Sequence, residues 1–142
     1  MYLLDTNVVS ELRKAKAGKA HPRVVAWNAI VAPAETFISA ISVLELEWGV
    51  LRVERRDPRQ GSIMRLWMEK HVLPGFSGRV LPIDAQVAQR CAALHFPDPR
   101  PERDALIAST ALVHGMTVVT RNVSDFASTG VPTLNPWEWE PA

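Results

Sequence analysis

Residues 1–7, MYLLDTN, open the chain with a short apolar run that ends at an acid. Four apolar residues are too few for a helix, so this run predicts a buried β-strand. Thr6 or Asn7 can cap a helix that would begin at Val8. The opening stretch therefore predicts a strand followed by a helix, with Asp5 at the C-terminal end of the strand.

The same alternation of strand and helix continues along the rest of the chain. Asp57-Pro58 interrupts the helical periodicity, Gly115 closes the last helix, and residues 97–101 form a stiff, proline-rich loop. Largely apolar strands that alternate with helices are typical of a parallel sheet covered on both faces. We therefore expect a three-layer α/β/α domain around a mostly parallel sheet of four to five strands. The expected strands are 36–39, 79–83, 116–120 and a short edge strand at 133–134; the expected helices are 22 to about 31, 41 to about 55, 63–72 as far as Pro74-Gly75, 84–95 and 102–114.

Length and composition describe an ordinary globular chain of 142 residues. Hydrophobic residues make up 47% and charged residues 22%, and no boundary signal divides the chain, so we expect a single domain over residues 1–142. The net charge of +1 gives little long-range attraction to a polyanion, so contact with nucleic acid must come from local charge. Two basic clusters are candidates, although each can also be a solvated helix face. They are Arg13, Lys14, Lys16, Lys19 and Arg23, and Arg52, Arg55, Arg56 and Arg59.

The cysteine content and the hydropathy of the chain indicate the cellular compartment of the protein. Cys91 is the only cysteine, so no intramolecular disulfide can form, which favours a reducing compartment. No apolar stretch approaches membrane-spanning length, and the N-terminus lacks a signal-peptide pattern. We therefore expect a cytoplasmic protein with no membrane partner.

Asp5 and Asp104 are the first two candidates for a functional site. Asp104 continues the apolar stripe of helix 102–114, so it faces inward near the start of that helix. Because this helix runs antiparallel to the strand that follows it, its N-terminus lies at the same sheet edge as Asp5. Either acid could instead be a helix-terminal residue that only caps the helix or stabilises its dipole.

Glu45 and Asp125 are expected at the same edge of the sheet. Glu45 lies early in the helix after the second strand, but periodicity does not separate it from Glu47, because both have apolar neighbours. Gly49 stands one turn later, where a side chain would lean over Glu45. Asp125 follows the strand 116–120 and can also be an ordinary turn residue. Four acids from distant segments at one edge indicate a functional cluster.

Such a cluster predicts a divalent cation. Carboxylates within a few ångström repel one another unless a cation compensates their charge. Oxygen ligands alone favour Mg²⁺ or Mn²⁺, and no spacing of cysteine or histidine suggests zinc. The histidines are dispersed along the chain, and none is assigned to catalysis.

Four motifs, in their order and spacing, resemble the PIN-domain ribonucleases. The resemblance spans nearly the whole chain, and within the family it is closest to the VapC toxins, particularly their FitB-like branch. Ser109 stands where this resemblance leads us to expect alanine, a departure that concerns packing and not chemistry. The motifs are LLDTN at 3–7, Glu45-Leu46 with Gly49, DALIA at 104–108, and TRN at 120–122 with Asp125-Phe126.

The resemblance implies a Mg²⁺-dependent endoribonuclease, with Mn²⁺ as an alternative metal. One or two ions would be held by the acids, and Asp5 and Asp104 would be the principal ligands. The hydroxyl of Thr6 would support a metal-bound water, and a polar loop would position Asp125. The implied catalytic and metal-binding residues are Asp5, Glu45, Asp104 and Asp125; the implied supporting residues are Thr6, Asn7, Thr120 and Asn122, of which Thr120 and Asn122 form that loop.

The resemblance also implies partners. VapC toxins pair with a small antitoxin encoded beside them, and contact with DNA would be indirect, through the antitoxin. RNA would be the substrate, and direct hydrolysis would leave a 5′-phosphate and a 3′-hydroxyl. A homodimer is expected through the apolar surface of the helices at 41–55 and 63–72, including Trp48 and Trp67.

Two other functions remain open. A Mg²⁺-dependent phosphohydrolase of the haloacid dehalogenase type also begins with an aspartate after its first strand, but it needs a second aspartate where Asn7 stands. A receiver domain would need an adjacent acidic pair, which the chain lacks. A catalytically silent PIN-fold binding module would keep the fold and lose the reaction, and the presence of all four acids argues against it.

Overall fold

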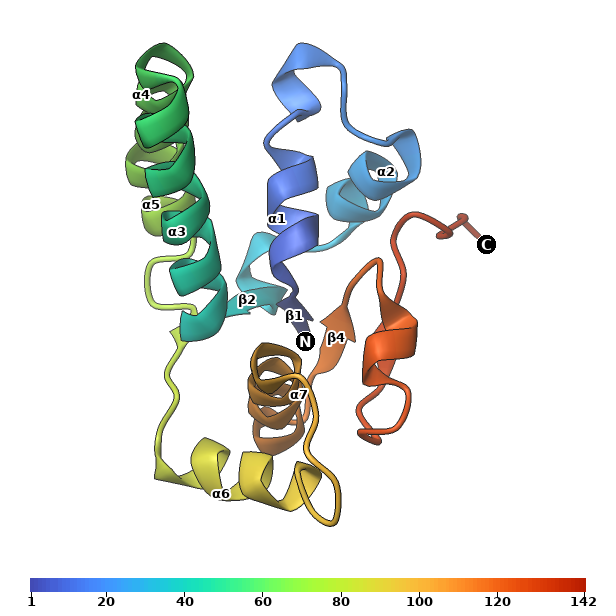
Figure 1. Ribbon diagram of the computed structural model, residues 1–142. Coiled ribbons are helices and arrows are strands. Elements are labelled where there is room, and N and C mark those ends of the chain that lie inside the picture. The colour runs from blue at the N-terminus through green and yellow to red at the C-terminus, as the bar shows by residue number, and fades with distance from the viewer.

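The computed structural model describes all residues, 1–142, and centres on a sheet of five parallel strands (Figure 1). The order across the sheet is β3-β2-β1-β4-β5, so the first strand of the chain is the central one. Every neighbouring pair is parallel, which confirms the expected parallel sheet. The strands are β1 (Tyr2–Leu4), β2 (Thr36–Ser39), β3 (Val80–Leu81), β4 (Thr117–Val119) and β5 (Thr133–Leu134).

Helices connect the strands, and most lie where the sequence predicts them. The predicted helix 63–72 begins earlier, at Pro58, because Asp57 ends one helix and caps the next. None of the helices combines the length and the apolar character needed to cross a membrane. The helices are α1 (Thr6–Leu12), α2 (Pro22–Ile30), α3 (Ala40–Arg56), α4 (Pro58–Trp67), α5 (Leu73–Gly75), α6 (Ala85–Leu94) and α7 (Glu102–His114); a π-helical turn, η3 (Met68–Val72), joins α4 to α5, and 3₁₀ turns are η1 (Ala15–Ala17), η2 (Pro33–Glu35) and η4 (Val123–Phe126).

The start of α1 differs from the expectation that Thr6 or Asn7 caps a helix from Val8. Asp5 is the capping residue, with extended backbone angles and a side-chain oxygen that accepts from the Thr6 N–H at 2.8 Å. Aspartate is among the preferred N-cap residues, so a single residue separates the strand from the helix. Asp5 therefore lies between strand and helix with no intervening loop.

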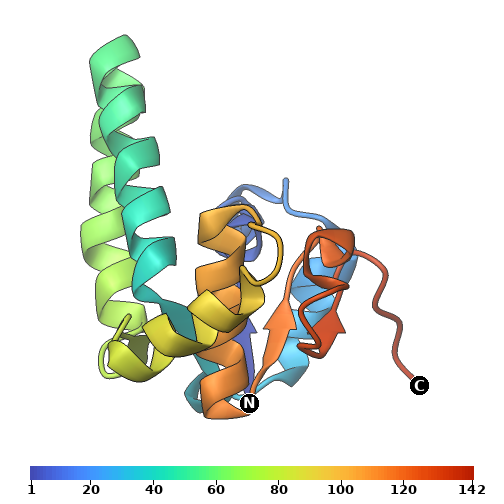
Figure 2. The ribbon, with the colours of Figure 1, turned by 60° about the horizontal axis from the view of Figure 1, so that its bottom comes forward.

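Alternation along the strands buries both faces of the sheet. Leu3 packs in a cluster with α7, whereas Leu4 packs in a second cluster with α1, α2 and α3. Val118 and Val119 of β4 divide between the same two clusters. Successive side chains on a strand point to opposite faces, so these pairs fix the helices in two layers. Figures 1 and 2 show α6 and α7 on one side and the other helices across the sheet.

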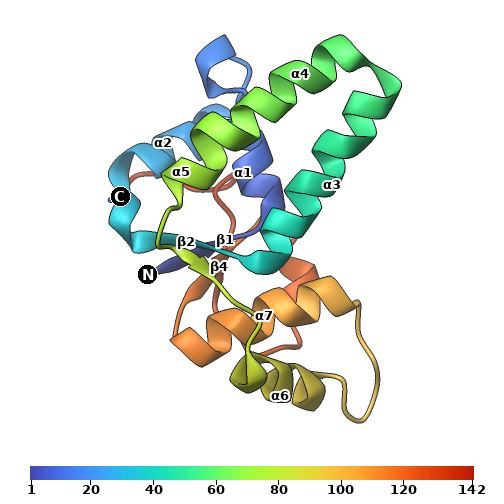
Figure 3. The same ribbon diagram turned by 90° about the vertical axis from the view of Figure 1, so that its left-hand side faces the viewer.

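Helices α3 and α4 form a hairpin that extends beyond the sheet (Figure 3). Arg65 of α4 pairs with Glu47 of α3 through two N–H···O contacts of 2.7 Å, and with Glu54 at 2.9 Å. Gly61 of α4 is buried against α3, and a Cβ there would collide with the backbone of Glu54. The hairpin therefore depends on a close backbone approach at Gly61.

We predict that Gly61→Ala lowers the free energy of unfolding by about 1–3 kcal/mol, because the added carbon collides with backbone that cannot turn away. Gly49→Ala is the matched control. A Cβ at this position of α3 meets nothing within 4 Å, so alanine should raise stability by about 0.5–1 kcal/mol through helix propensity. Urea denaturation of both variants measures the effect. Equal stability of the two would contradict the close packing of the hairpin.

Candidate active site

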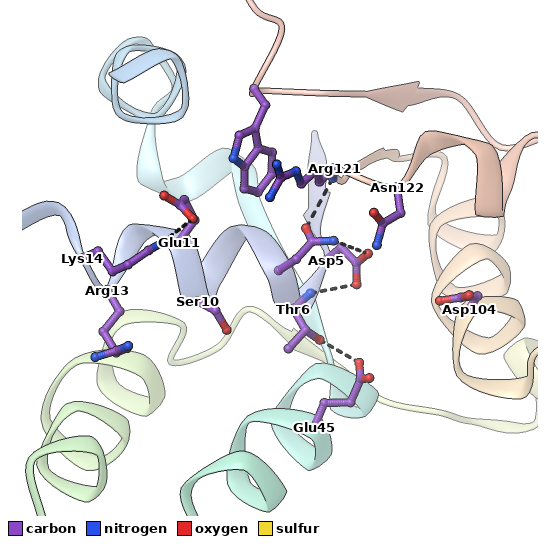
Figure 4. Close-up of a pocket in the computed structure, with 12 residues that line it drawn as sticks. Asp5, Thr6, Ser10, Glu11, Arg13, Lys14, Glu45, Asp104, Arg121 and Asn122 are labelled. Carbon is purple, nitrogen blue, oxygen red and sulfur yellow. Dashed lines mark hydrogen bonds and ion pairs between the residues drawn. The ribbon is translucent and has the colours of Figure 1, made fainter. Parts of the chain in front are cut away.

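A polar pocket of about 560 Å³ opens at the C-terminal edge of the sheet (Figure 4). Asp5 enters it from the end of β1, Glu45 from α3, and Asp104 from the first turn of α7. Parallel strands end at the same edge, which is why residues so distant in sequence meet. The other lining residues include Thr6, Asn7, Ser10, Arg121, Asn122 and Trp137.

Asp5 is buried and fixed by several hydrogen bonds. Its backbone N–H donates to the Val119 carbonyl at 2.9 Å and so extends the pairing of β1 with β4. One carboxylate oxygen accepts from the Thr6 N–H, and the other accepts from the Thr120 hydroxyl at 2.8 Å. The Asn7 side-chain amide donates to that second oxygen at 3.4 Å. The carboxylate therefore has one position, set by residues on both sides.

The pKa of Asp5 is raised from 3.8 to about 6, mainly by burial. Hydrogen bonds from Thr120 and Thr6 oppose this shift, and the nearby charges of Glu45 and Asp104 contribute to it. Burial also raises the pKa of Asp104, and the charges of Asp125 and Glu45 add to that shift. The pocket therefore holds carboxylates whose ionisation is mutually unfavourable.

The structure distinguishes Glu45 from Glu47. Glu45 lines the pocket, and its Oε1 accepts from the Thr6 hydroxyl at 2.7 Å. Glu47 points to α4, where its bond with Arg65 holds the pKa of its carboxyl below the usual range. A Cβ at Gly49 would touch nothing within 4 Å, so an alanine there would not crowd Glu45; whether a larger side chain would do so stays a prediction.

Asp104 lines the pocket, whereas Asp125 lies outside its wall. Pro101 occupies the cap position of α7 and no side chain caps that helix end, so Asp104 is not the helix cap. None of the salt bridges in the protein includes Asp104. Asp125 is exposed in η4 and does not line the pocket, but its charge reaches Asp104. Three of the four predicted acids thus share one cavity, and the fourth lies beside it.

The predicted supporting residues connect these acids. Thr6 donates to Glu45, and Thr120 donates to Asp5 although the resemblance implied that it helps to position Asp125. The backbone carbonyl of Asn122 does accept from the Asp125 N–H at 3.0 Å. Asn7 of α1 connects this helix to the segment after β4. Its side-chain amide donates to Thr120 at 3.3 Å, and its side-chain carbonyl accepts from the Arg121 N–H at 3.4 Å.

Sequence reasoning missed several residues of the pocket wall. Ser10 lies one turn after Thr6 on α1, so helical spacing could have found it. Arg121 adjoins Thr120 and could have been inferred, whereas Trp137 comes from the C-terminal segment and had no signal. Of the two basic clusters, only Arg13 and Lys14 line the pocket, and Lys14 pairs with Glu11 at 2.8 Å.

The donor set suits a divalent cation in its chemistry but is not closed around one point. Asp5, Glu45 and Asp104 supply only carboxylate oxygens, and the raised pKa values of Asp5 and Asp104 favour a compensating positive charge in the pocket. No three acidic, histidine or cysteine side chains lie close enough together to hold one ion as they stand. By ligand type the acids therefore fit a divalent cation such as Mg²⁺ or Mn²⁺.

Comparison with known proteins identifies a family. The model of the PIN domain matches residues 2–131. The chain is 37% identical over 143 residues to VapC ribonuclease Y4jK of Sinorhizobium fredii (strain NBRC 101917 / NGR234), with 97% of this chain and 99% of the relative covered. It is 35% identical over 142 residues to Toxin FitB of Neisseria gonorrhoeae (strain ATCC 700825 / FA 1090), with 96% and 99% covered. The solved structure of FitAB bound to IR36 DNA fragment contains a similar chain, with a TM-score of 0.86, 36% identity and 99% of both chains covered.

The raised pKa of Asp5 predicts a specific pH dependence of metal-free stability. Between pH 4 and pH 6 the folded protein binds more protons at Asp5 than the unfolded chain does, so the free energy of unfolding falls as pH rises. Asp5→Asn removes this dependence, and its advantage over the parent should grow to about 3 kcal/mol at pH 7. Urea denaturation in a chelator across this range tests it. If the difference in the free energy of unfolding between Asp5→Asn and the parent stayed constant with pH, the raised pKa of the buried Asp5 would be contradicted.

Proposed function

The chain belongs to the PIN-domain family, and from this premise we propose that it is a metal-dependent endoribonuclease that acts as the toxin of a toxin–antitoxin pair. The observation that supports this most strongly is the convergence of Asp5, Glu45 and Asp104 from three separate elements into one polar pocket. Its relatives include a VapC ribonuclease and the FitB toxin, and the chain aligns with nearly their full length. The proposed fold unit is one PIN domain over residues 1–142.

The proposed roles follow from the contacts of each side chain. Asp5 and Asp104 are the principal metal ligands, because their carboxylates face the pocket without a cationic partner. Glu45 shares that task, and the Thr6 hydroxyl orients it from 2.7 Å. Asp125 contributes from the adjacent turn, outside the pocket wall. The supporting roles fall to Thr120 and Asn7, which hold Asp5, and to Asn122, whose carbonyl anchors the turn of Asp125.

We propose Mg²⁺ as the metal, with Mn²⁺ as a substitute. When bound, such an ion lowers the pKa of a water molecule and stabilises charge on the phosphodiester. The carboxylates would hold the ion, and the fixed position of Asp5 would set its place at the end of β1. Neutralisation of the acids would also allow a phosphate to enter a pocket that otherwise repels it.

Hydrolysis is proposed to leave a 5′-phosphate and a 3′-hydroxyl. Attack by the RNA 2′-hydroxyl, which gives a cyclic phosphate, needs a general base such as histidine. His21, His71, His95 and His114 do not line the acidic pocket. The residues that do line it are carboxylates, hydroxyls, amides and cations around one tryptophan, which suits an attacking water.

An apolar groove beside the acidic pocket supports the proposed antitoxin partner. The groove has a volume of about 420 Å³, lies between α1 and α4, and shares Arg13 with the pocket. Ile63 and Leu66 in its wall are more than half exposed, at 57% and 58%. We propose that a segment of the antitoxin covers them and brings a basic side chain to the acids, which would exclude RNA or metal. We propose that any contact with DNA is made through the antitoxin; one similar solved structure is that of FitAB bound to a DNA fragment.

The homodimer stays a prediction, and the two tryptophans support it less than expected. Trp67 already packs against the core, with the Arg13 guanidinium over its ring. Trp48 is exposed but faces two arginines. Exposed apolar side chains do remain on this surface, among them Leu44 and Leu51 of α3.

We also propose that the protein acts in the cytoplasm, because that is where its proposed RNA substrate is found.

The geometry gives no specific support to the other functions. The position that needs a second aspartate in a haloacid dehalogenase-type phosphohydrolase is Asn7, whose amide is engaged with Asp5 and Thr120. A silent binding module would not require Asp5 and Asp104, whose pKa values are raised, to share one cavity with Glu45, since an unused acid that destabilises the fold can be lost without cost.

We predict that Asp104→Asn and Glu45→Gln each reduce Mg²⁺-dependent RNA cleavage at least about a hundredfold, because each removes a ligand charge and keeps the shape. In metal-free buffer, Asp104→Asn should be as stable as the parent or more stable, since it relieves repulsion, and added Mg²⁺ should raise its melting temperature less. Gel analysis of cleavage and thermal melting with Mg²⁺ or chelator measure both effects.

Glu47→Gln is the matched control, because it removes the same charge from α3 outside the pocket. It should keep activity within about threefold and lose about 1 kcal/mol or less through the exposed bond with Arg65. The proposed site would be refuted if Asp104→Asn cleaved RNA as well as Glu47→Gln does and its melting temperature rose equally on addition of Mg²⁺. Cleavage products that end in a cyclic phosphate would refute the proposed chemistry.

A further inference from the structure

Two arginines beside the acidic pocket are held by tryptophan rings. The Arg121 guanidinium lies 5.3 Å from the ring centre of Trp137, and the Arg103 guanidinium lies 4.8 Å from that of Trp48. Arg121 and Trp137 line the pocket, and Arg103 approaches the pocket residue Glu45. These are separate parts of the fold, so the same arrangement occurs twice at one site.

The two arginines lie on different sides of Asp5. Figure 4 shows Arg121 on one side of Asp5 and Glu45 on the other. Arg103 belongs to the Glu45 side, because its Nη1 is 3.4 Å from Glu45 Oε2. A chain of phosphates that crosses the pocket over Asp5 would therefore meet one guanidinium before the acids and another after them.

A guanidinium on an aromatic face stays available to an anion. Cation–π contact holds the group without cancelling its charge, and the N–H donors at its edge remain free to form hydrogen bonds. An ion pair acts differently: Lys14 is neutralised by Glu11 at 2.8 Å. The contact of Arg103 with Glu45 is looser, at 3.4 Å, and longer than the usual 2.7–2.9 Å of charged hydrogen bonds.

The charge balance of the protein makes such cations necessary. The net charge is only +1, and acids line the pocket, so attraction to a polyanion must come from local cations in and beside the pocket wall. Arg103 is 47% exposed in its side chain and Trp48 is 47% exposed, so both can be reached. Two further pairs differ in place: Arg13, over Trp67 at 5.9 Å, is shared by the pocket and the apolar groove, and Arg52 is a second cation over Trp48, at 5.4 Å.

We propose that Arg103 and Arg121, each held by its tryptophan, bind the RNA phosphates on the two sides of the scissile one. The inference rests on the proposed ribonuclease function and adds the residues that position its substrate. With each guanidinium held at its indole ring, the RNA backbone runs from the Trp137 side of the pocket to the Trp48 side.

Steady-state cleavage of a fluorescent single-stranded RNA oligonucleotide at saturating Mg²⁺ tests this. Arg103→Gln and Arg121→Gln should each raise KM about tenfold and leave kcat within about threefold. The dependence of log KM on log salt concentration should become flatter by about 0.7 for each lost phosphate contact. Arg90→Gln is the charge-matched control: Arg90 is exposed on α6, away from the pocket, and its loss should change neither value.

Tryptophan variants test how the arginine is held. Trp48→Leu should raise KM severalfold, and Trp48→Phe, which keeps an aromatic face, should restore it. If Arg103→Gln alters kcat and the Mg²⁺ midpoint but not KM, Arg103 serves Glu45 and the proposal fails for it. The proposal would be overturned if Arg90→Gln raised KM as much as Arg103→Gln or Arg121→Gln does. It would also be overturned if the variants with a raised KM differed from the parent in the molecular mass of the protein in solution. If the parent protein does not cleave the RNA, the ribonuclease function fails, and filter binding of the same RNA then tests the arginines alone.

Discussion

The rest of the site depends on one electrostatic constraint: the carboxylate of Asp5 is buried, and the carboxylates of Glu45 and Asp104 lie near it. Asp5 is 6% exposed, and the fold fixes it by pairing β1 with β4 and by capping α1 with the same residue. No loop separates strand from helix, so Asp5 cannot move away from Glu45 and Asp104. Burial and like charge both oppose its ionisation, and only a positive charge in the pocket removes that opposition.

The architecture explains how so few residues create this constraint. β1 is the central strand, and its neighbours β2 and β4 lead to the segments that supply Glu45 and Thr120. Helix α7 returns antiparallel to β4 and brings Asp104 to the same edge. Two apolar clusters, one on each face of the sheet, hold these elements in register. The stability of those clusters offsets the unfavourable charge at the edge, as is common for functional sites.

Much of this arrangement is predictable from sequence because it follows from strand topology. Asp5 and Asp104 lie beside apolar patterns whose direction is readable, so their meeting at one edge could be inferred. Glu45 could not be separated from Glu47, because the distinction depends on Arg65 of another helix. The close approach at Gly61, the Trp137 wall and the stacking of Arg103 on Trp48 were also missed. These contacts join segments with no local pattern in common, so three-dimensional packing alone reveals them.

Calorimetric titration of the protein with Mg²⁺ in two buffers of different ionisation enthalpy tests the central claim most directly. Because a bound cation favours the ionised acids, the account predicts that binding at pH 6 releases about half a proton or more, mainly from Asp5, and that the release disappears by pH 8. Absence of Mg²⁺ binding, or binding at pH 6 without proton release, would contradict the claim that Asp5 and the acids beside it form the metal site.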